Sequence, residues 1–243
     1  MLTKHLLPGS LREWVRHKLR GAGFDIVPFP RMQMLARHGV TVLFDVGASD
    51  GLYAEDLRRL GYAGRIVSFE PRADAFARLT QRARRDPLWE TVPIALGRTA
   101  GASVLHVTGA GDSSSLLPLL PHHADTAPGI ATIAEETIDV RTLDEVFDTY
   151  VKPSDVVFLK MDVQGYEQHV LDGAAQTLGR IAGLQLELSF APIYDGETLF
   201  SEMVAQLAAK GFVLVGLEPG LRHPRTQQLL QTDGLFVRAP DSP

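Results

Sequence analysis

The sequence contains no cysteine among its 243 residues. This absence excludes disulfide bonds, thiolate zinc sites and cysteine nucleophiles, and it is compatible with a reducing compartment. Long apolar runs are also missing: none reaches the roughly 18 residues of a membrane-spanning helix, and the first residues lack the pattern of a secretory signal. We therefore expect a cytoplasmic protein with no membrane span.

Positive charge is in short supply as well. The formal net charge is -5 and no long basic run is present, so the sequence gives little support for non-specific electrostatic binding to nucleic acid. What is present is ordinary for a globular protein, with 45% hydrophobic and 22% charged residues. This composition predicts one large domain with a sizeable core, and it leaves the oligomeric state undetermined.

Apolar runs and helical spacing alternate along most of the chain. Residues 40–47 and 64–71 are continuous β-branched and aromatic runs, typical of strands buried on both faces of a parallel sheet. Helical spacing follows each run, and the alternation resumes from residue 142 to residue 211. The pattern predicts an α/β fold with a doubly wound, mostly parallel sheet that ends in an antiparallel edge hairpin.

Two stretches stand apart from this alternation. Residues 1–39 predict an N-terminal helical segment, because SLREWVRHKLRGAGF has amphipathic helical spacing with a basic outer face. Residues 40–243 form the main domain, in which residues 99–136 are dominated by Gly, Ser, Pro and His. We expect this second stretch to be an insertion that forms a hairpin and a mobile loop and shapes a substrate pocket.

A turn of small and acidic residues, LFDVGASDG, follows the first buried strand. It lies at the carboxyl end of the strands, where open α/β sheets bind ligands. The dinucleotide fingerprint Gly-x-Gly-x-x-Gly fails here, because Ser49 and Leu52 replace two of its glycines, which disfavours NAD. Asp45 and Asp50 would repel a pyrophosphate but attract a cationic ligand.

S-adenosylmethionine is such a ligand, because it carries a sulfonium and an ammonium group. Asp45 can meet its methionine end, while Gly47 and Ala48 let it lie against the backbone. Downstream, VSFEP places Glu70 at the end of the second strand, where a carboxylate can accept both ribose hydroxyls. The alternative for Asp45 and Asp50 is that each caps a turn or a helix.

With these motifs the sequence resembles the FkbM-type S-adenosylmethionine-dependent methyltransferases. The matching pieces occur in the family's order and spacing over roughly residues 40–236: FDVGASDGLYAEDLRRLGYAGRIVSFEP, PIALG, SSSL, RTLDEVF, FLKMDVQGYEQHVLDGA and LQLEL. The resemblance implies a Rossmann-like class I methyltransferase. It also implies O-methylation of a small-molecule hydroxyl, such as that of a sugar or polyketide, in secondary-metabolite or glycoconjugate biosynthesis.

The resemblance also implies a cofactor site, in which Glu70 holds the ribose and Ala95 and Leu96 lie near the adenine. The expected cofactor-binding residues are Asp45, Gly47, Ala48, Ser49, Asp50, Gly51, Glu70, Pro71, Ala95, Leu96, Ser114, Ser115 and Asp162. The chain departs from the family at Gln164, where most members have Glu. A carboxamide keeps the hydrogen bonding of a carboxylate but loses its charge.

Three charged residues at the ends of later strands are candidates for catalysis: Asp162, Glu187 and Lys160. Asp162 ends the run FLKMD, where it could accept the proton of a hydroxyl acceptor, orient the acceptor or bind a divalent ion. Glu187 needs a partner if it is buried, either Lys160 or the substrate. We assign no metal ligands, because His122 in PHHAD has no spaced third ligand.

Two further interpretations stay open at this point. Gln164 is compatible with a domain that binds the cofactor or a partner without catalysis. An NAD-dependent oxidoreductase is the other interpretation, although Ser49 and Leu52 weigh against it. The sequence does not identify the methyl acceptor, the general base or any metal requirement.

Overall fold

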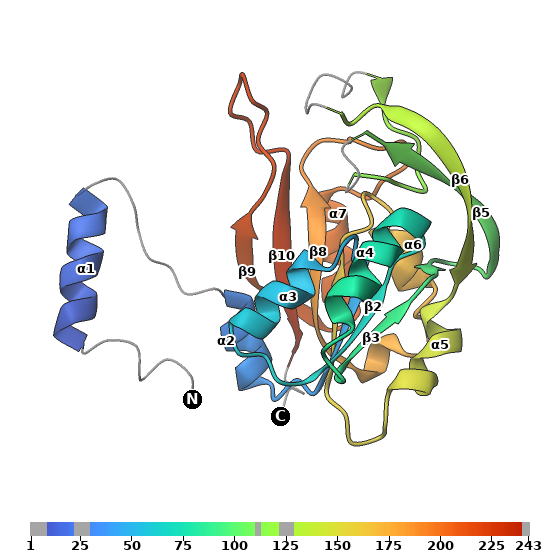
Figure 1. The fold of residues 1–243 in the computed structure, drawn as a ribbon. Helices are drawn as coiled ribbons and strands as arrows, with labels where there is room; N and C mark the ends of the chain where they lie inside the picture. Colours follow the sequence, from blue (N-terminus) through green and yellow to red (C-terminus); the bar gives the residue numbers. More distant parts are fainter. Residues whose placement is uncertain (1–8, 22–29, 110–112, 122–128, 240–243) are drawn as a thin grey trace.

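The computed structural model describes residues 9–21, 30–109, 113–121 and 129–239. A seven-stranded sheet lies at its centre (Figure 1). Its strands are β1 (Val42–Val46), β2 (Arg65–Phe69), β3 (Trp89–Val92), β7 (Val157–Met161), β8 (Ile181–Ser189), β9 (Phe212–Pro219) and β10 (Gln231–Arg238). They are arranged in the order β3-β2-β1-β7-β8-β10-β9.

Only β10 runs against its neighbours in this sheet. The pairs from β3 through β2, β1 and β7 to β8 are all parallel, whereas β10 is antiparallel to both β8 and β9. The predicted mostly parallel α/β sheet with a C-terminal antiparallel hairpin is therefore confirmed. The hairpin is inserted in reverse order, so that β9 is the edge strand and β10 lies inside the sheet.

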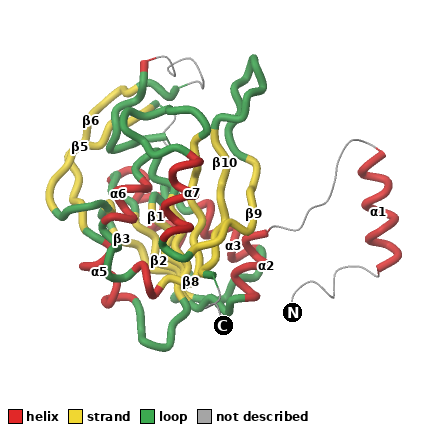
Figure 2. The backbone as a smooth tube through the Cα atoms, turned by 180° about the vertical axis from the view of Figure 1, so that it is seen from behind, coloured by secondary structure: helices red, strands yellow, loops and turns green. Residues whose placement is uncertain are grey.

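Helices cover both faces of the sheet, as a doubly wound fold requires. They are α2 (Pro30–Arg37), α3 (Leu52–Arg59), α4 (Ala73–Ala83), α5 (Leu143–Tyr150), α6 (Glu167–Asp172) and α7 (Phe200–Ala209), with a 3-10 turn at Leu178–Arg180. Figure 1 looks onto α3 and α4, and the reverse view in Figure 2 looks onto α7.

Alternating side chains of the strands explain these two layers. In β1, Leu43 packs with residues of α2, α3 and α4, whereas its neighbour Phe44 packs with residues of α5, α6 and α7. Because successive strand side chains point to opposite faces, a wholly apolar strand needs cover on both sides. Leu35 in α2 is 1% exposed, so the second helix of the predicted N-terminal segment contributes to the core of the main domain.

A small second sheet has the order β4-β6-β5, with β4 (Ala95–Leu96), β5 (Gly101–Thr108) and β6 (Thr132–Arg141). It contains β5 and the first half of β6 from the region predicted as an insertion, whereas β4 and the end of β6 lie outside that region. The predicted hairpin is present as the antiparallel β5–β6 pair. The stretch TVPIALG, residues 91–97, has the composition of a single short strand, but this interpretation is wrong, because the chain leaves the main sheet after Val92 and β4 pairs with β6 instead.

Two helices differ from the others in extent or in surroundings. The spacing of YEQHVLDGAAQTLGR, residues 166–180, predicts one helix, but α6 ends at Asp172, where Gly173 packs so closely that an added Cβ would lie 2.0 Å from the Gly97 carbonyl oxygen. The helix α1 (Gly9–Gly21) is present, and Figure 1 shows it apart from the sheet, with the Trp14 side chain 58% exposed.

Candidate cofactor and acceptor site

The turn after β1 brings the ends of three strands together. Gly47 has φ +72°, and a Cβ on it would lie 1.9 Å from the main-chain oxygen of Asp162. The Gly47 and Ala48 N–H groups both donate to the Phe69 carbonyl oxygen at 3.1 Å. Only glycine allows this approach of β1 to β7, so the glycine that the sequence marked is required by packing within the protein itself.

Glu70 completes this turn from the end of β2. Its Oε2 accepts the Ser49 N–H at 2.8 Å and its Oε1 accepts the Arg72 N–H at 2.9 Å. Burial raises the pKa of Glu70 and outweighs the two N–H donors and the nearby Arg72 and Lys160, which lower it. Each carboxylate oxygen keeps a further lone pair for a ligand hydroxyl.

A cleft opens beside these residues, between the carboxyl ends of the strands and the small second sheet. The residues that line it are Val46, Gly47, Ser49, Phe69, Glu70, Pro71, Arg72, Ala95, Leu96, Leu105, Ser114, Leu116, Ile138, Asp162, Val163 and Tyr166. This set includes eight of the residues expected at the cofactor: Gly47, Ser49, Glu70, Pro71, Ala95, Leu96, Ser114 and Asp162.

The other five expected cofactor residues lie outside this lining: Asp45, Ala48, Asp50, Gly51 and Ser115. Asp50 forms an ion pair with Arg82 of α4 at 2.9 Å, and its Oδ1 accepts the N–H of Leu52 in the first turn of α3. That arrangement matches the capping alternative for Asp50, and its role toward a cofactor stays a prediction.

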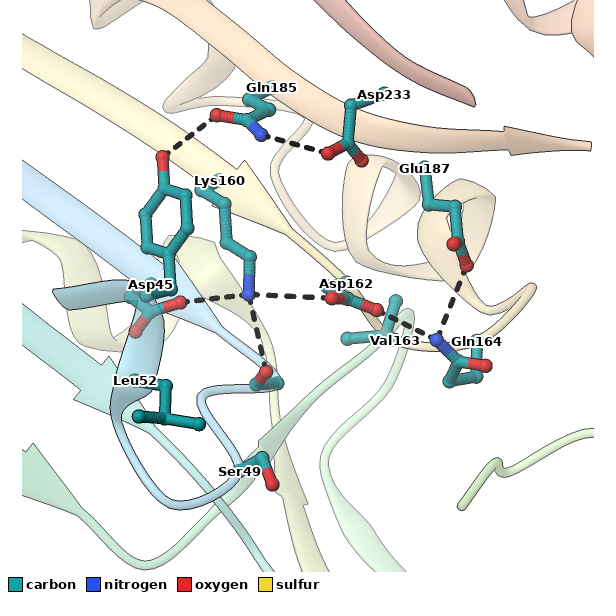
Figure 3. Close-up of polar contacts among 12 residues, drawn as sticks. Asp45, Ser49, Leu52, Lys160, Asp162, Val163, Gln164, Gln185, Glu187 and Asp233 are labelled. Atoms are coloured by element: carbon teal, nitrogen blue, oxygen red, sulfur yellow. Dashed lines mark hydrogen bonds and ion pairs between the residues drawn. The ribbon is translucent and has the colours of Figure 1, made fainter. Parts of the chain in front are cut away.

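Asp45 is fully buried and its carboxylate already has two partners. Lys160 Nζ lies 3.0 Å from Asp45 Oδ1 (Figure 3). Ser68 Oγ donates to Asp45 Oδ2 at 3.1 Å. Lys160 also donates to the Gly47 carbonyl oxygen at 3.3 Å and lies 5.0 Å from the centre of the Tyr53 ring. Burial would lower the pKa of Lys160, but the carboxylates around it, Asp45 first, raise it above its usual value.

Glu187 does not form the ion pair with Lys160 that the sequence allowed. Its Oε2 accepts hydrogen bonds from the amides of Gln164 at 3.2 Å and Gln231 at 2.8 Å. Of the two partners considered for Glu187, Lys160 is therefore not the one, because Asp45 lies directly opposite Lys160 in the β1–β7 register and binds its ammonium group. Burial, reinforced by Asp162 and further acids nearby, raises the pKa of Glu187 well above its usual value.

Asp162 is the predicted catalytic residue that reaches the cleft. Its side chain is 43% exposed, and its Oδ2 lies 3.8 Å from Lys160 Nζ. The Gln164 amide donates to its other oxygen, Oδ1, at 2.8 Å (Figure 3). Asp162 therefore presents a hydrogen-bonded carboxylate to the same cleft that Glu70 lines. Lys160 and Glu187 do not line the cleft: Lys160 lies near Asp162, and Glu187 is connected to it through Gln164.

The serine pair of the insertion connects both sides of the cleft. Ser114 Oγ accepts from Arg72 Nη1 at 3.2 Å, beside the β2 turn. Ser115 Oγ donates to the Gln164 main-chain oxygen at 2.6 Å, beside the β7 turn. The Tyr194 hydroxyl, from the loop after β8, donates to Gln164 Oε1 at 2.8 Å.

Sequence reasoning missed several residues of the site. Arg72 directly follows the SFEP motif and Tyr166 lies inside the quoted run DVQGYE, so proximity to a motif could have suggested both. Leu105 and Ile138 line the cleft from the β5–β6 hairpin. The only sequence signal for this position is the alternation of apolar and polar residues in that hairpin. Nothing in the sequence indicates that Tyr194 would contact Gln164.

The described part of the chain contains neither a metal-binding cluster nor a membrane-spanning helix. No group of three or more His, Asp or Glu side chains in the described part of the chain is placed to hold a metal ion. His122 lies outside the described residues. His169 stacks on Tyr166 with ring centres 4.1 Å apart. Within the described ranges, no helix is both long and apolar enough to cross a membrane.

Some solved structures resemble the chain at low identity. An rRNA methylase from Streptococcus thermophilus shares 12% identity over 89% of this chain and 100% of its own, with a TM-score of 0.45. Fibrillarin from Aeropyrum pernix, in complex with S-adenosyl-L-methionine, shares 12% identity over 82% of this chain and 66% of its own, with a TM-score of 0.47. The comparison with curated proteins gave no match.

A family model decides the assignment. The model of the methyltransferase FkbM domain matches residues 45–214, which begin at Asp45 near the end of β1 and end within β9. The matched region includes Glu70, Asp162 and Glu187 and most of the main sheet. The chain therefore belongs to the FkbM methyltransferase domain family and is an S-adenosylmethionine-dependent methyltransferase.

Proposed function

We propose that the protein transfers the methyl group of S-adenosylmethionine to a hydroxyl oxygen of a small molecule, and that the acceptor is a sugar or a polyketide. One observation carries the choice of oxygen. The Asp162 carboxylate lines the cleft with 43% of its side chain exposed, where it can take the proton of an alcohol. An alcohol needs such a base near neutral pH more than an amine does.

The residues of the cleft fit the cofactor. Glu70 offers a carboxylate to the ribose hydroxyls, and the main-chain approach at Gly47 and Ser49 leaves a bare wall for the methionine end. The apolar side chains of Leu96 and Ile138 provide a surface for a flat, uncharged adenine ring. When bound, S-adenosylmethionine supplies an activated methyl group, so the chain's own residues have mainly to orient the acceptor and remove its proton.

Asp162 is the residue we propose as the proton acceptor. Gln164 fixes one of its oxygens and the ammonium group of Lys160 lies near the other, so the carboxylate is held in place and its negative charge is stabilised. Lys160 and Glu187 do not line the cleft, and we assign them a supporting role. The insertion, through β5, β6 and the serine pair, borders the cleft and is proposed to select the acceptor.

The test has two steps. The first is calorimetric titration of the purified protein with S-adenosylmethionine, S-adenosylhomocysteine and NAD, in which we expect only the adenosyl ligands to bind. The second is incubation with methyl-labelled S-adenosylmethionine and a panel of hydroxylated sugars and polyketides, each paired with an amine or thiol analogue. Released S-adenosylhomocysteine and labelled product are measured together.

The expected outcome is transfer to alcohols over their matched amines and thiols, and loss of that transfer by at least about a hundredfold in Asp162→Asn, which cannot accept a proton. Asp172→Asn is the matched control, because Asp172 pairs with Arg98 away from the cleft. Preferred transfer to amines would overturn the choice of oxygen. Cofactor binding without transfer to any member of the panel would favour a non-catalytic binding domain.

A further inference from the structure

Gln164 joins the residues on the acceptor side of the cleft, the side where Asp162 lies, because it is hydrogen-bonded to Asp162, Glu187 and Tyr194. Its side-chain Nε2 donates to Asp162 Oδ1 at 2.8 Å and to Glu187 Oε2 at 3.2 Å (Figure 3). Its Oε1 accepts from the Tyr194 hydroxyl at 2.8 Å, so both N–H groups and the oxygen have partners. The opposite amide orientation would direct its oxygen at two carboxylates. The contacts therefore fix which end is the donor.

The backbone at this position is also held in an uncommon conformation. Gln164 has φ +55° and is followed by Gly165 at φ +88°. A residue with a long side chain in the left-handed region costs roughly 1 kcal/mol, and such a conformation persists where surrounding contacts enforce it. Here the Ser115 hydroxyl donates to the Gln164 carbonyl oxygen at 2.6 Å, so the insertion helps to hold the turn in place.

Negative charge accumulates around this amide. Glu187 lies directly opposite Asp233 in the β8–β10 register, an arrangement that repels when both acids are charged. Other carboxylates that act on Glu187 come from three further segments: Asp162, Glu167 and Glu197. Lys160 is the cation nearest to Asp162 among the ion pairs of the described residues, and it lies closer to Asp45, at 3.0 Å against 3.8 Å.

We propose that Gln164 is a positioning residue for methyl transfer: its amide holds the Asp162 carboxylate in the orientation that faces the acceptor and keeps Glu187 hydrogen-bonded behind it. The proposal rests on the function proposed above. A carboxylate at this position has no proton to donate, and its protonated form has only one, so a glutamate could replace the amide toward Asp162 only while it is protonated. The amide donates to both Asp162 and Glu187 at every pH.

The chain contains a matched control for this role. The amide of Gln231 also donates to Glu187 Oε2, at 2.8 Å, but none of its hydrogen bonds reaches Asp162. Gln164→Met and Gln231→Met remove the same chemical group from Glu187. Only Gln164→Met also removes the donor from Asp162.

The first test needs no acceptor. Protein labelled with ¹³C at the Asp and Glu side-chain carboxyl carbons, with S-adenosylhomocysteine bound, is titrated and followed by NMR, and Asp162→Asn assigns the resonance of interest. Because an N–H donor favours the charged form of its acceptor, Gln164→Met should move the titration midpoint of Asp162 upward by about one unit. Gln231→Met should leave that midpoint in place and shift only Glu187.

Gln164→Glu keeps the proposal testable if the methionine variant folds poorly. Its introduced carboxyl can donate while it is protonated, so the Asp162 resonance should match that of the wild type at low pH and depart from it as the new group ionises. An Asp162 titration that is unchanged in Gln164→Met, or a Gln164→Glu resonance that matches the wild type at all pH values, would overturn the proposal.

The second test uses an acceptor from the panel above. Gln164→Met should lower kcat by about tenfold at every pH with little change in the KM for S-adenosylmethionine. Gln164→Glu should recover wild-type kcat only toward low pH, a proton-dependent rescue that a purely structural role would not produce. If no panel member is methylated, the proposed function fails while the NMR result still decides the role of Gln164.

Discussion

The two halves of the cleft are built from different chemical groups. On the cofactor side, Glu70 is held by the main-chain N–H groups of Ser49 and Arg72. On the acceptor side, Asp162 and Glu187 are held by side-chain amides, above all that of Gln164. A site held by main-chain groups keeps its geometry through most substitutions, whereas a site held by side chains can be changed by a single one. This contrast is expected where one half binds a common cofactor and the other a particular acceptor.

The largest effect is expected where the two halves join, at Lys160. Its ammonium group contacts Asp45 of the cofactor side and lies 3.8 Å from Asp162 of the acceptor side. Lys160→Met leaves Asp45, which is 0% exposed, as an uncompensated buried charge. We expect a loss of about 3–5 kcal/mol in the free energy of unfolding, measured by urea denaturation at pH 7.

The double variant Asp45→Asn/Lys160→Met separates charge from packing. Because it removes both charges, it should recover a large part of the stability lost in Lys160→Met alone. Equal losses in the single and double variants would mean that Lys160 acts through its packing on Tyr53 and not through the ion pair.

The next largest effect concerns the glycine that holds β1 against β7. Gly47→Ala places a Cβ 1.9 Å from the Asp162 carbonyl oxygen in a backbone with φ +72°, whereas Gly39→Ala has φ +63° and meets nothing within 4 Å. The control should cost about 1 kcal/mol for its backbone conformation. Gly47→Ala should cost about 3 kcal/mol and also weaken cofactor binding, because the turn must move. Equal losses of thermal stability in Gly47→Ala and Gly39→Ala would show that the clash at residue 47 is relieved at no cost.

The position of the turns after β1 and β2 was largely predictable from sequence, because each turn directly follows a buried strand. LFDVGASDG and VSFEP each lie at the end of a buried strand, and the ends of parallel strands meet at one edge of the sheet. The direction of the Asp45 side chain was not predictable, since it depends on strand register. Ser68 and Lys160 are its direct partners on the two neighbouring strands, and both bind its carboxylate.

The acceptor side could be predicted only in part. FLKMD correctly placed Asp162 at the carboxyl end of a strand, and that residue reaches the cleft. The partners of Gln164 come from the loop after β8, from the insertion and from β8 itself. Such contacts join residues far apart in the chain, and neither hydrophobic periodicity nor a short motif encodes them.

A buried acid on the acceptor side should make stability depend on pH. Glu167 is 4% exposed, and among the described residues its carboxylate accepts from main-chain N–H groups, those of Val163 and of Glu167 itself. Burial raises its pKa from 4.5 to about 8. The folded protein then binds this proton more tightly than the unfolded chain, so the stabilisation is complete below pH 4.5 and is lost as pH rises toward about 8.

Glu167→Gln removes that titration while it keeps an oxygen to accept the Val163 N–H. We expect the variant to show a flatter stability profile and to gain about 4 kcal/mol relative to wild type between pH 5 and pH 8.5, measured by urea denaturation at intervals of pH. Parallel profiles for the two proteins would show that Glu167 does not carry the pH dependence.

The same substitution on the cofactor side should have a smaller and different effect. Glu70→Gln leaves one acceptor oxygen for two main-chain donors, so either the Ser49 or the Arg72 N–H meets an NH₂ group instead. Because a hydrogen bond to a charged group is worth about 1.5–3 kcal/mol, affinity for S-adenosylhomocysteine should fall at least about tenfold in calorimetric titrations at pH 8. Glu90→Gln, at an exposed acid on β3, should leave this affinity unchanged.

Since burial raises the pKa of Glu70, the affinity of the wild type for S-adenosylhomocysteine should decline as the pH is lowered, whereas the affinity of Glu70→Gln should not change with pH. Glu70→Gln could instead change the free energy of unfolding, as expected for Glu167→Gln, and keep the affinity for S-adenosylhomocysteine. In that case the carboxylate charge would have the same role on the cofactor side of the cleft as on the acceptor side.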